Sequence, residues 1–298
     1  MAEIVKIPFD LPFGISLFIQ RDDLLHPMIS GNKFRKLKYN IAAAQAQSAK
    51  GLITFGGAYS NHILATAAAG KEYGLPTVGI VRGEELESKW QENPTLVQCV
   101  ALGMQLRFVS RAAYALKEES TEIKAVINEF TGFCLLPEGG TNELALKGCS
   151  EILDGHTQHY DYICVAVGTG GTISGIINAS KAEQKIIGYS ALKGDFLIEE
   201  INNFAIHKNW ELRTDYHFGA YAKVTDDLVR FMNDFYIKTK IPLDPIYTGK
   251  MVFGVLEDIK NGFFKPNSSV LLLHTGGLQG IKGVNNKRKG KSQIKYEI

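Results

Sequence analysis

The sequence has few of the features that mark a secreted, membrane-bound or nucleic-acid-binding protein. It contains four cysteines, widely spaced and without a Cys-x-x-Cys pair, which argues against a disulfide scaffold and against a zinc site. The formal net charge is only +2 and the body of the chain has no basic stripe, so no nucleic-acid partner is expected. No apolar run approaches the length of a membrane span, and residues 1–6 lack the pattern of a signal peptide. We therefore expect a cytoplasmic protein with inert thiols and with no metal or membrane partner.

Short apolar runs separated by helical patterns are what the chain does contain. Of its 298 residues, 45% are hydrophobic and 21% charged, as in an ordinary globular protein. One set of apolar runs lies at 52–55, 77–81, 105–109 and 133–136, and a second set at 162–167, 185–189 and 270–273. Unbroken runs of this length, alternating with helices, predict parallel sheets covered on both faces. The fold class is therefore α/β, with two three-layer α/β/α domains.

The order of the two sets of runs predicts how the domains divide the chain. We expect residues 1–40 and 146–298 to form a large domain and residues 41–145 to form a small domain inserted into it. The last residues, 285–298, contain the basic run KRKGK and are expected to form a flexible, solvated tail.

The stretch 31–37 (GNKFRKL) contains the first candidate for chemistry. Lys33 stands at the start of a predicted helix, with Arg35, Lys36 and Lys38 close by in sequence. A lysine becomes a nucleophile when burial or neighbouring cations lower its pKa, although a solvated surface charge is the common alternative. The stretch alone therefore leaves both interpretations open.

The second candidate is a glycine-rich turn between an apolar run and a predicted helix. It consists of Gly168, Thr169, Gly170, Gly171 and Thr172. Glycines let backbone amides approach an anion closely, and the start of the following helix adds a partial positive charge. No acidic residue lies about 20 positions on, as a dinucleotide site requires, so a small phosphorylated cofactor fits better. A tight turn without a ligand and a nucleotide-dependent enzyme are the alternatives.

Three further segments place polar residues where α/β enzymes bind ligands. Residues 56–62 (GGAYSNH) combine two glycines with Ser60, Asn61 and His62, and a carboxylate could bind at the helix start there. Ser60 could also act simply as a helix cap, and His62 as a solvated first-turn residue. Residues 243–250 (LDPIYTGK) contain Tyr247, for which a core aromatic is the default interpretation, and residues 272–277 (LLHTGG) end a buried strand.

Taken in order, these segments resemble those of one family. The chain looks like the pyridoxal-phosphate enzymes of the 1-aminocyclopropane-1-carboxylate deaminase and D-cysteine desulfhydrase group, from about Arg21 to Gly277. The resemblance implies a tryptophan-synthase-β-like fold, pyridoxal 5'-phosphate as cofactor, a small amino acid as substrate and a homodimer.

The resemblance also implies roles for individual residues. Lys33 would form the Schiff base with the cofactor and move protons at the substrate Cα, while Asn61 would hydrogen-bond the ring hydroxyl. Residues 168–172 would hold the phosphate, and Tyr247 would lie against the ring and take part in catalysis. Ser60 would bind the substrate carboxylate and assist the chemistry, with Asn61, His62 and Tyr247 also lining the substrate.

Two threonines favour one substrate over another. Family members that open the cyclopropane ring resemble one another in having a glutamate where this chain has Thr248, and an apolar residue in place of Thr275. A carboxylate keeps the pyridine nitrogen protonated and gives a strong electron sink, whereas threonine offers only a neutral hydrogen bond. The pair therefore favours β-elimination from a small D-amino acid, with D-cysteine giving pyruvate, sulfide and ammonia. Ring opening and a non-catalytic cofactor-binding protein are the alternatives, and the short segment 190–215 leaves the exact amino acid open.

Overall fold

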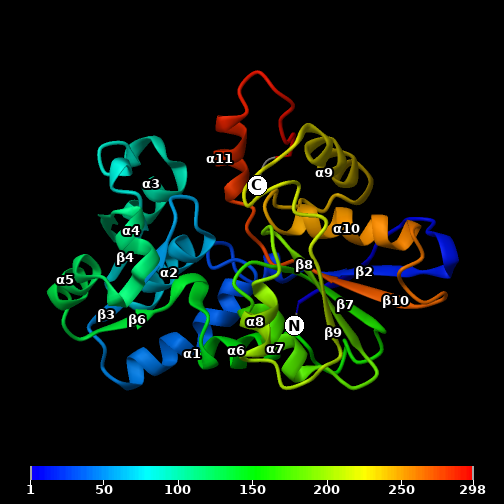
Figure 1. Cartoon of the computed structure of the whole chain (residues 1–298), viewed down its shortest axis with the longest axis horizontal. Coiled ribbons are helices and arrows are strands. Elements are labelled where there is room, and N and C mark those ends of the chain that lie inside the picture. The colour runs from blue at the N-terminus through cyan, green and yellow to red at the C-terminus, as the bar shows by residue number, and fades with distance from the viewer. Residues whose placement is uncertain (1, 297–298) are drawn as a thin grey trace.

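The computed structural model describes residues 2–296 and contains two sheets side by side, each with its own helices (Figure 1). The larger sheet has six strands in the order β1-β2-β10-β7-β8-β9, all parallel except the edge strand β1. These strands are β1 (Ile4–Lys6), β2 (Ser16–Gln20), β7 (Tyr162–Val167), β8 (Lys185–Ser190), β9 (Trp210–Arg213) and β10 (Ser269–Leu273). Strands from both ends of the chain therefore meet at the centre of this sheet.

The smaller sheet is entirely parallel and has four strands in the order β5-β4-β3-β6. These are β3 (Gly51–Gly56), β4 (Thr77–Arg82), β5 (Gln105–Val109) and β6 (Phe133–Leu136). The apolar runs predicted from the sequence agree with the observed strands to within one residue at each end. The prediction did not include β9, whose four residues are all only half-buried and so produce no apolar run.

Helices cover both faces of each sheet, as Figure 1 shows. They are α1 (Asn32–Ala46), α2 (Asn61–Tyr73), α3 (Pro94–Ala101), α4 (Arg111–Leu116), α5 (Thr121–Glu129), α6 (Glu143–Ser150), α7 (Gly171–Ala179), α8 (Leu197–Asn202), α9 (Asp226–Thr239), α10 (Thr248–Lys260) and α11 (Gly280–Lys287). Short 3-10 turns lie at Pro12–Gly14, Asp22–Leu24, Glu84–Leu86, Trp90–Glu92, Lys117–Glu119 and Glu138–Gly140.

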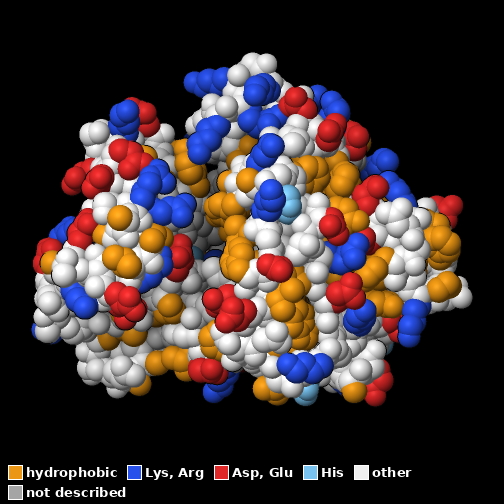
Figure 2. Space-filling view, viewed as in Figure 1, with side chains coloured by type: hydrophobic (Ala, Val, Ile, Leu, Met, Phe, Trp, Pro, Cys, Tyr) orange, Lys and Arg blue, Asp and Glu red, His pale blue; other side chains and the backbone are white. Residues whose placement is uncertain are grey.

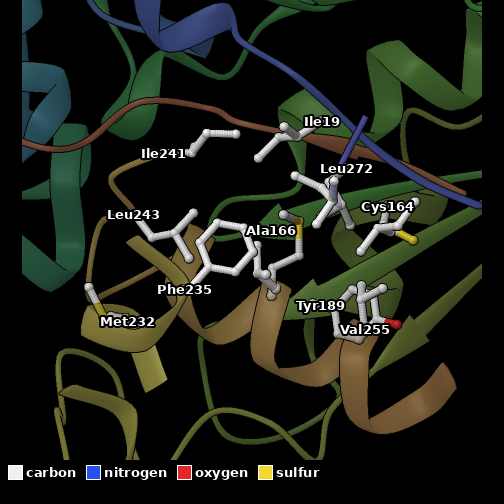
Figure 3. Close-up of a cluster of buried hydrophobic side chains, with 14 of the residues drawn as sticks. Ile19, Cys164, Ala166, Tyr189, Met232, Phe235, Ile241, Leu243, Val255 and Leu272 are labelled. Atoms are coloured by element: carbon white, nitrogen blue, oxygen red, sulfur yellow. The ribbon is translucent and has the colours of Figure 1, made fainter. Parts of the chain in front are cut away.

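Strand β7 illustrates how the sequence produces the three layers. Because side chains alternate along a strand, Cys164 and Ala166 face the core beneath α9 and α10 (Figure 3), whereas Val165 and Val167 face α7 and α8. Both faces are fully apolar, as expected for a parallel strand covered by helices on each side. Each of the two valines contributes roughly 1.5–3 kcal/mol on complete burial. The predicted three-layer α/β fold is confirmed.

The predicted boundaries of the two domains stay a prediction. All strands of the smaller sheet lie within 51–136, and all strands of the larger sheet lie outside that range. Helix α1 continues across residue 40, however, and packs Leu37 and Ile41 against the side of the smaller sheet.

The end of the chain differs from the flexible tail predicted for 285–298. Residues 285–287 complete α11, and Ile294 and Tyr296 are buried in the core beneath α9. The Tyr296 hydroxyl donates to the carbonyl oxygen of Leu243 at 2.6 Å. The packing was not predicted because the apolar residues come only after the basic run. Residues 297–298 lie outside the described part of the chain.

Within residues 2–296, no helix combines the length and the apolar character needed to cross a membrane.

Candidate active site

The site begins at Gly31, immediately before α1. Gly31 has φ +62°, and an ideal Cβ there would lie 2.0 Å from the carbonyl oxygen of Thr275. The backbone N–H of Asn32 donates to the same oxygen at 3.2 Å. Only glycine permits this approach. The start of α1 is therefore held against the residues that follow β10, and Lys33 lies at this junction.

The ammonium of Lys33 lies beside a second lysine. Lys36, one turn further along α1, is 1% exposed, and its Nζ donates to Gly139 O at 2.9 Å and to Thr141 Oγ1 at 3.1 Å. Burial, followed by the positive charge of Lys36, lowers the pKa of Lys33 from 10.5 to about 7. About half of the Lys33 amines are therefore neutral near pH 7, as a nucleophile or proton acceptor requires.

The other two cations of this stretch, Arg35 and Lys38, form ion pairs with acidic residues. Arg35 pairs with Asp22 at 3.2 Å, and Lys38 pairs with Glu151 at 2.6 Å on the surface. The sequence prediction of a positive neighbourhood is therefore correct for Lys36 alone, because only the i+3 position shares the face of α1 with Lys33.

The glycine turn between β7 and α7 has the form of an anion cradle. Gly170 has φ +78°, and a Cβ on Gly171 would lie 3.1 Å from the ammonium of Lys36. The first amides of α7 have no acceptor in the preceding helical turn, so they can bind an anion. Thr172 Oγ1 accepts a hydrogen bond from Asn32 Nδ2 at 2.8 Å, which joins the turn to the start of α1.

Thr169 closes the open side of this turn. Its hydroxyl lies 2.8 Å from the hydroxyl of Thr141, the residue that also accepts from Lys36. Amides, hydroxyls and one ammonium thus surround the same turn. This donor set fits a phosphate.

Loop 56–60 lies across from the turn and starts α2. Ser60 caps the helix, since its Oγ accepts from the amides of His62 at 3.2 Å and Ile63 at 3.3 Å. This confirms the capping interpretation of Ser60, and its hydroxyl proton remains available to a ligand carboxylate at the helix N-terminus. Asn61, the first residue of α2, accepts a hydrogen bond on Oδ1 from Gln279 Nε2 at 2.5 Å.

His62 is a correction to the sequence prediction. Its side chain is 2% exposed, lies beneath Gly140 and bonds Thr54 Oγ1 through Nε2 at 2.8 Å. Burial, followed by the cations of Lys33 and Lys36, holds the pKa of His62 well below its usual value. His62 is therefore a neutral core residue rather than a solvated first-turn residue, and its contact with a substrate stays a prediction. The second position of α2 points toward the sheet, which a short motif does not reveal.

Tyr247 stands directly before α10 and borders the glycine turn. A Cβ on Gly168 would lie 3.0 Å from Tyr247 Cε1, so glycine allows the ring to lie flat against the turn. The Tyr247 hydroxyl is 3.2 Å from that of Tyr221, a residue of the loop before α9. Burial raises the pKa of Tyr247 well above its usual value, so the phenol is a proton donor in the resting site.

The hydroxyl of Thr248 forms more hydrogen bonds within the protein than the sequence suggests. Its Oγ1 donates to Asp244 Oδ1 at 2.8 Å and accepts from the Asp244 N–H at 2.8 Å. Its single proton is therefore committed, and one lone pair remains for another donor. The hydroxyl of Thr275 forms no hydrogen bond within residues 2–296. A contact of either threonine with a cofactor ring stays a prediction.

The structure thus brings Lys33, the turn 168–172, Tyr247, Asn61 and Thr275 to one place, where the two halves of the molecule meet. Figure 2 shows a deep hollow between the surface over the smaller sheet and that over the larger sheet. An amine of lowered pKa, a phosphate cradle and an aromatic wall are the parts that an aldehyde cofactor with a phosphate requires. Within residues 2–296, no three His, Cys, Asp or Glu side chains are arranged to hold a metal ion.

Fold and site together define an enzyme that uses pyridoxal phosphate. Residues 4–276 match the family described as pyridoxal-phosphate dependent enzymes, and the chain belongs to this family. Its cofactor is pyridoxal phosphate, as the resemblance in sequence implied.

Individual relatives indicate which group within this family the chain resembles. The bifunctional D-cysteine desulfhydrase/1-aminocyclopropane-1-carboxylate deaminase of Arabidopsis thaliana, a mitochondrial protein, is 30% identical over 308 residues, which cover 91% of this chain and 74% of the plant protein. A Thermotoga maritima protein with the provisional name of 1-aminocyclopropane-1-carboxylate deaminase is also 30% identical, covering 90% and 91% of the two chains. A crystal structure described as an ACC deaminase homologue has a TM-score of 0.82 at 27% identity, covering 96% of this chain and 92% of that one. The expected group within the family is confirmed.

Two residues of the site were not assigned a role from the sequence. Tyr221 lies in an irregular loop and Gln279 in a turn, and each contacts the site across a large sequence separation, which for Gln279 and Asn61 is 218 residues. No local pattern could have found either one.

Proposed function

We propose that this enzyme catalyses β-elimination from a small D-amino acid, with D-cysteine and water giving pyruvate, sulfide and ammonia. The observation that carries the proposal is Thr248, whose hydroxyl offers a neutral acceptor where ring-opening members of the family have a carboxylate. When bound, pyridoxal phosphate withdraws electrons from the substrate Cα. A neutral partner gives a weaker sink, which suffices for departure of thiolate from Cβ but is poorly matched to opening a cyclopropane ring.

In this proposal the residues of the site have separate tasks. Lys33 holds the cofactor through its amine and accepts the proton from the substrate Cα, for which its pKa of about 7 is suited. The amides of the turn 168–172 and the ammonium of Lys36 bind the phosphate. Ser60 and the start of α2 bind the substrate carboxylate. Tyr247 lies along the ring and presents a protonated phenol to the leaving group.

The position of the cofactor is tested by reduction. Purified protein with bound cofactor should be yellow, and borohydride should fix the chromophore to one peptide, identified by mass spectrometry as the one containing Lys33. The same treatment of Lys36→Arg should label Lys33 again. Label on any other lysine would contradict the assignment.

The substrate is tested by comparing rates on the same holoenzyme. Sulfide release from D-cysteine should be faster than 2-oxobutyrate release from 1-aminocyclopropane-1-carboxylate, with L-cysteine as the enantiomer control. The names of the relatives favour the cyclopropane substrate as the second candidate. Faster release of 2-oxobutyrate would make that candidate correct and the argument from Thr248 wrong.

Association into a homodimer, suggested by family resemblance, is also a proposal. Light scattering coupled to size-exclusion chromatography should give twice the chain mass of 32.9 kDa. The cytoplasmic location suggested by the cysteine pattern is a proposal of the same kind.

A further inference from the structure

The side-chain amides of Gln279 and Asn61 form a hydrogen bond with a defined direction. Gln279 Nε2 donates to Asn61 Oδ1 at 2.5 Å, and both side chains are half-buried beside the proposed cofactor site. Gln279 follows the glycines after β10, whereas Asn61 is the first residue of α2. The contact therefore joins the two halves of the molecule at the place where the ring of the cofactor is proposed to lie.

The direction of this bond determines which end of the Asn61 amide faces the site. An amide has one acceptor oxygen and one donor nitrogen, and the two ends can exchange places by rotation of the group. In the structure Gln279 donates, so Oδ1 points toward Gln279 and Nδ2 points to the other side. There, Nδ2 lies next to Gly277, where an ideal Cβ would be 2.6 Å from it and φ is +93°. The glycine keeps this side open.

The position of Gln279 is itself supported by α11. Gly283 of α11 packs against the ring of Tyr59, such that a Cβ there would lie 2.6 Å from Tyr59 Cε1. The ammonium of Lys287, at the end of α11, lies 3.9 Å from the centroid of the same ring. Helix α11 is thus docked on the loop that precedes Asn61, so the two amides keep a fixed separation.

We propose that Gln279 is a positioning residue: it selects one of the two orientations of the Asn61 amide, and so presents Nδ2 as a donor to the ring hydroxyl of pyridoxal phosphate. This inference rests on the proposed role of Asn61 at the cofactor. It assigns to Gln279 a function beyond connecting the two halves of the chain. With the amide reversed, the oxygen of Asn61 would face the oxygen of the ring hydroxyl, which is repulsive when that group is ionised.

Substitution of Gln279 with glutamate tests whether this residue orients the Asn61 amide or only connects the two halves of the molecule. In Gln279→Glu the residue at 279 can only accept, so Asn61 must turn Nδ2 toward it; the bridge is kept and its direction is reversed. Gln279→Met removes the bond and leaves the amide free to rotate. Asn61→Ala removes the donor altogether. Dissociation of pyridoxal phosphate and the pH dependence of its absorption spectrum are measured on each protein without substrate.

We expect Gln279→Glu to weaken cofactor binding about tenfold or more and to shift the spectral titration in the same direction as Asn61→Ala, because a charge-assisted hydrogen bond is lost. Gln279→Met should have a smaller effect of the same sign. If Asn61→Ala has the effect but Gln279→Glu behaves like the native protein, the bridge is only structural and the inference is overturned while the proposed function stands. If Asn61→Ala has no effect, Asn61 does not contact the ring, and both its proposed role and the inference fail.

The charge added by glutamate requires its own control. A through-space effect of that charge should diminish between 0.05 M and 0.5 M salt, because screening becomes stronger, whereas a reversed amide should persist. Loss of the Gln279→Glu effect at high salt would therefore also overturn the inference.

Discussion

Replacement of Thr248 by valine should destabilise the protein strongly, although the two side chains have nearly the same shape. The Thr248 hydroxyl donates to the carboxylate of Asp244 and accepts from its backbone N–H, both at 2.8 Å, and both residues are fully buried. Valine removes both bonds and leaves the buried N–H without its acceptor. The charge-assisted bond contributes ~1.5–3 kcal/mol and the stranded amide costs ~1–3 kcal/mol, so the loss should be roughly 3 kcal/mol.

Thermal unfolding of the cofactor-free protein measures this loss. A change of roughly 3 kcal/mol corresponds to a fall in Tm of about 6–12 °C for domains of this size. Thr275→Val is the matched control: it removes a hydroxyl from the same site that forms no hydrogen bond within residues 2–296, so Tm should change by less than ~3 °C. If the two variants unfold at the same temperature, the hydrogen bonds between Thr248 and Asp244 do not contribute the stability that their distances predict.

Three further outcomes follow from the described contacts. Gly31→Ala should abolish cofactor binding, measured by absorbance, because its Cβ would lie 2.0 Å from the Thr275 carbonyl at a φ of +62°; native affinity would contradict this. In Lys36→Met, the pKa of Lys33 should rise above the native value of about 7 but stay below 10.5, because a like charge is removed while burial remains. The pH dependence of Lys33 acylation in the cofactor-free protein, followed by peptide mass spectrometry, measures this pKa. An unchanged midpoint would exclude an effect of the Lys36 charge on Lys33. Asp258→Ala should cost ~1–3 kcal/mol in chemical denaturation, because it removes the acceptor of the buried Tyr189 hydroxyl and of the half-buried Arg213 guanidinium, held at 3.0 Å, whereas exposed Asp215→Ala should change stability by less than ~0.5 kcal/mol.

The Lys33 amine also makes stability depend on pH in a defined direction. Its pKa is lowered in the folded protein, so between about pH 7 and 10.5 the unfolded chain binds more protons at this position than the folded one does. Stability attributable to Lys33 therefore increases with pH across that window. The difference in unfolding free energy between the native protein and Lys33→Met should show this positive slope, and a flat difference would contradict the lowered pKa.

The sequence predicted strands such as β3, β7 and β8 well because they are buried on both faces and so have unbroken apolar runs, whereas the half-buried β9 has none. The glycines were informative for a different reason: Gly31 marks a close approach that no other residue tolerates, and Gly170 marks a backbone turn with φ +78°. The orientation of individual side chains was not predictable. His62 could have been a solvated first-turn residue and instead points toward Thr54 of β3, because its direction depends on where the sheet lies under α2.

Other contacts were not predicted from the sequence. The hydroxyl of Thr248 was expected to bond the cofactor ring, and the sequence did not show that Asp244, four residues earlier, accepts its proton. Gln279 meets Asn61 only because the chain before α11 returns to the loop that precedes α2 and α11 packs against α3. The basic run at 287–291 suggested a disordered end, since the two apolar residues that anchor it, Ile294 and Tyr296, come after it.

The contact of Gly31 with the residues after β10 has a consequence for biosynthesis. The lysine that is proposed to carry the cofactor emerges from the ribosome early, but the surface on which it is held consists of residues near 275. Strand β10 must also enter between β2 and β7 before that surface exists. A nascent chain therefore cannot acquire its cofactor in the native manner until β10 and the residues after it have been synthesised, and a product truncated before residue 269 should be colourless.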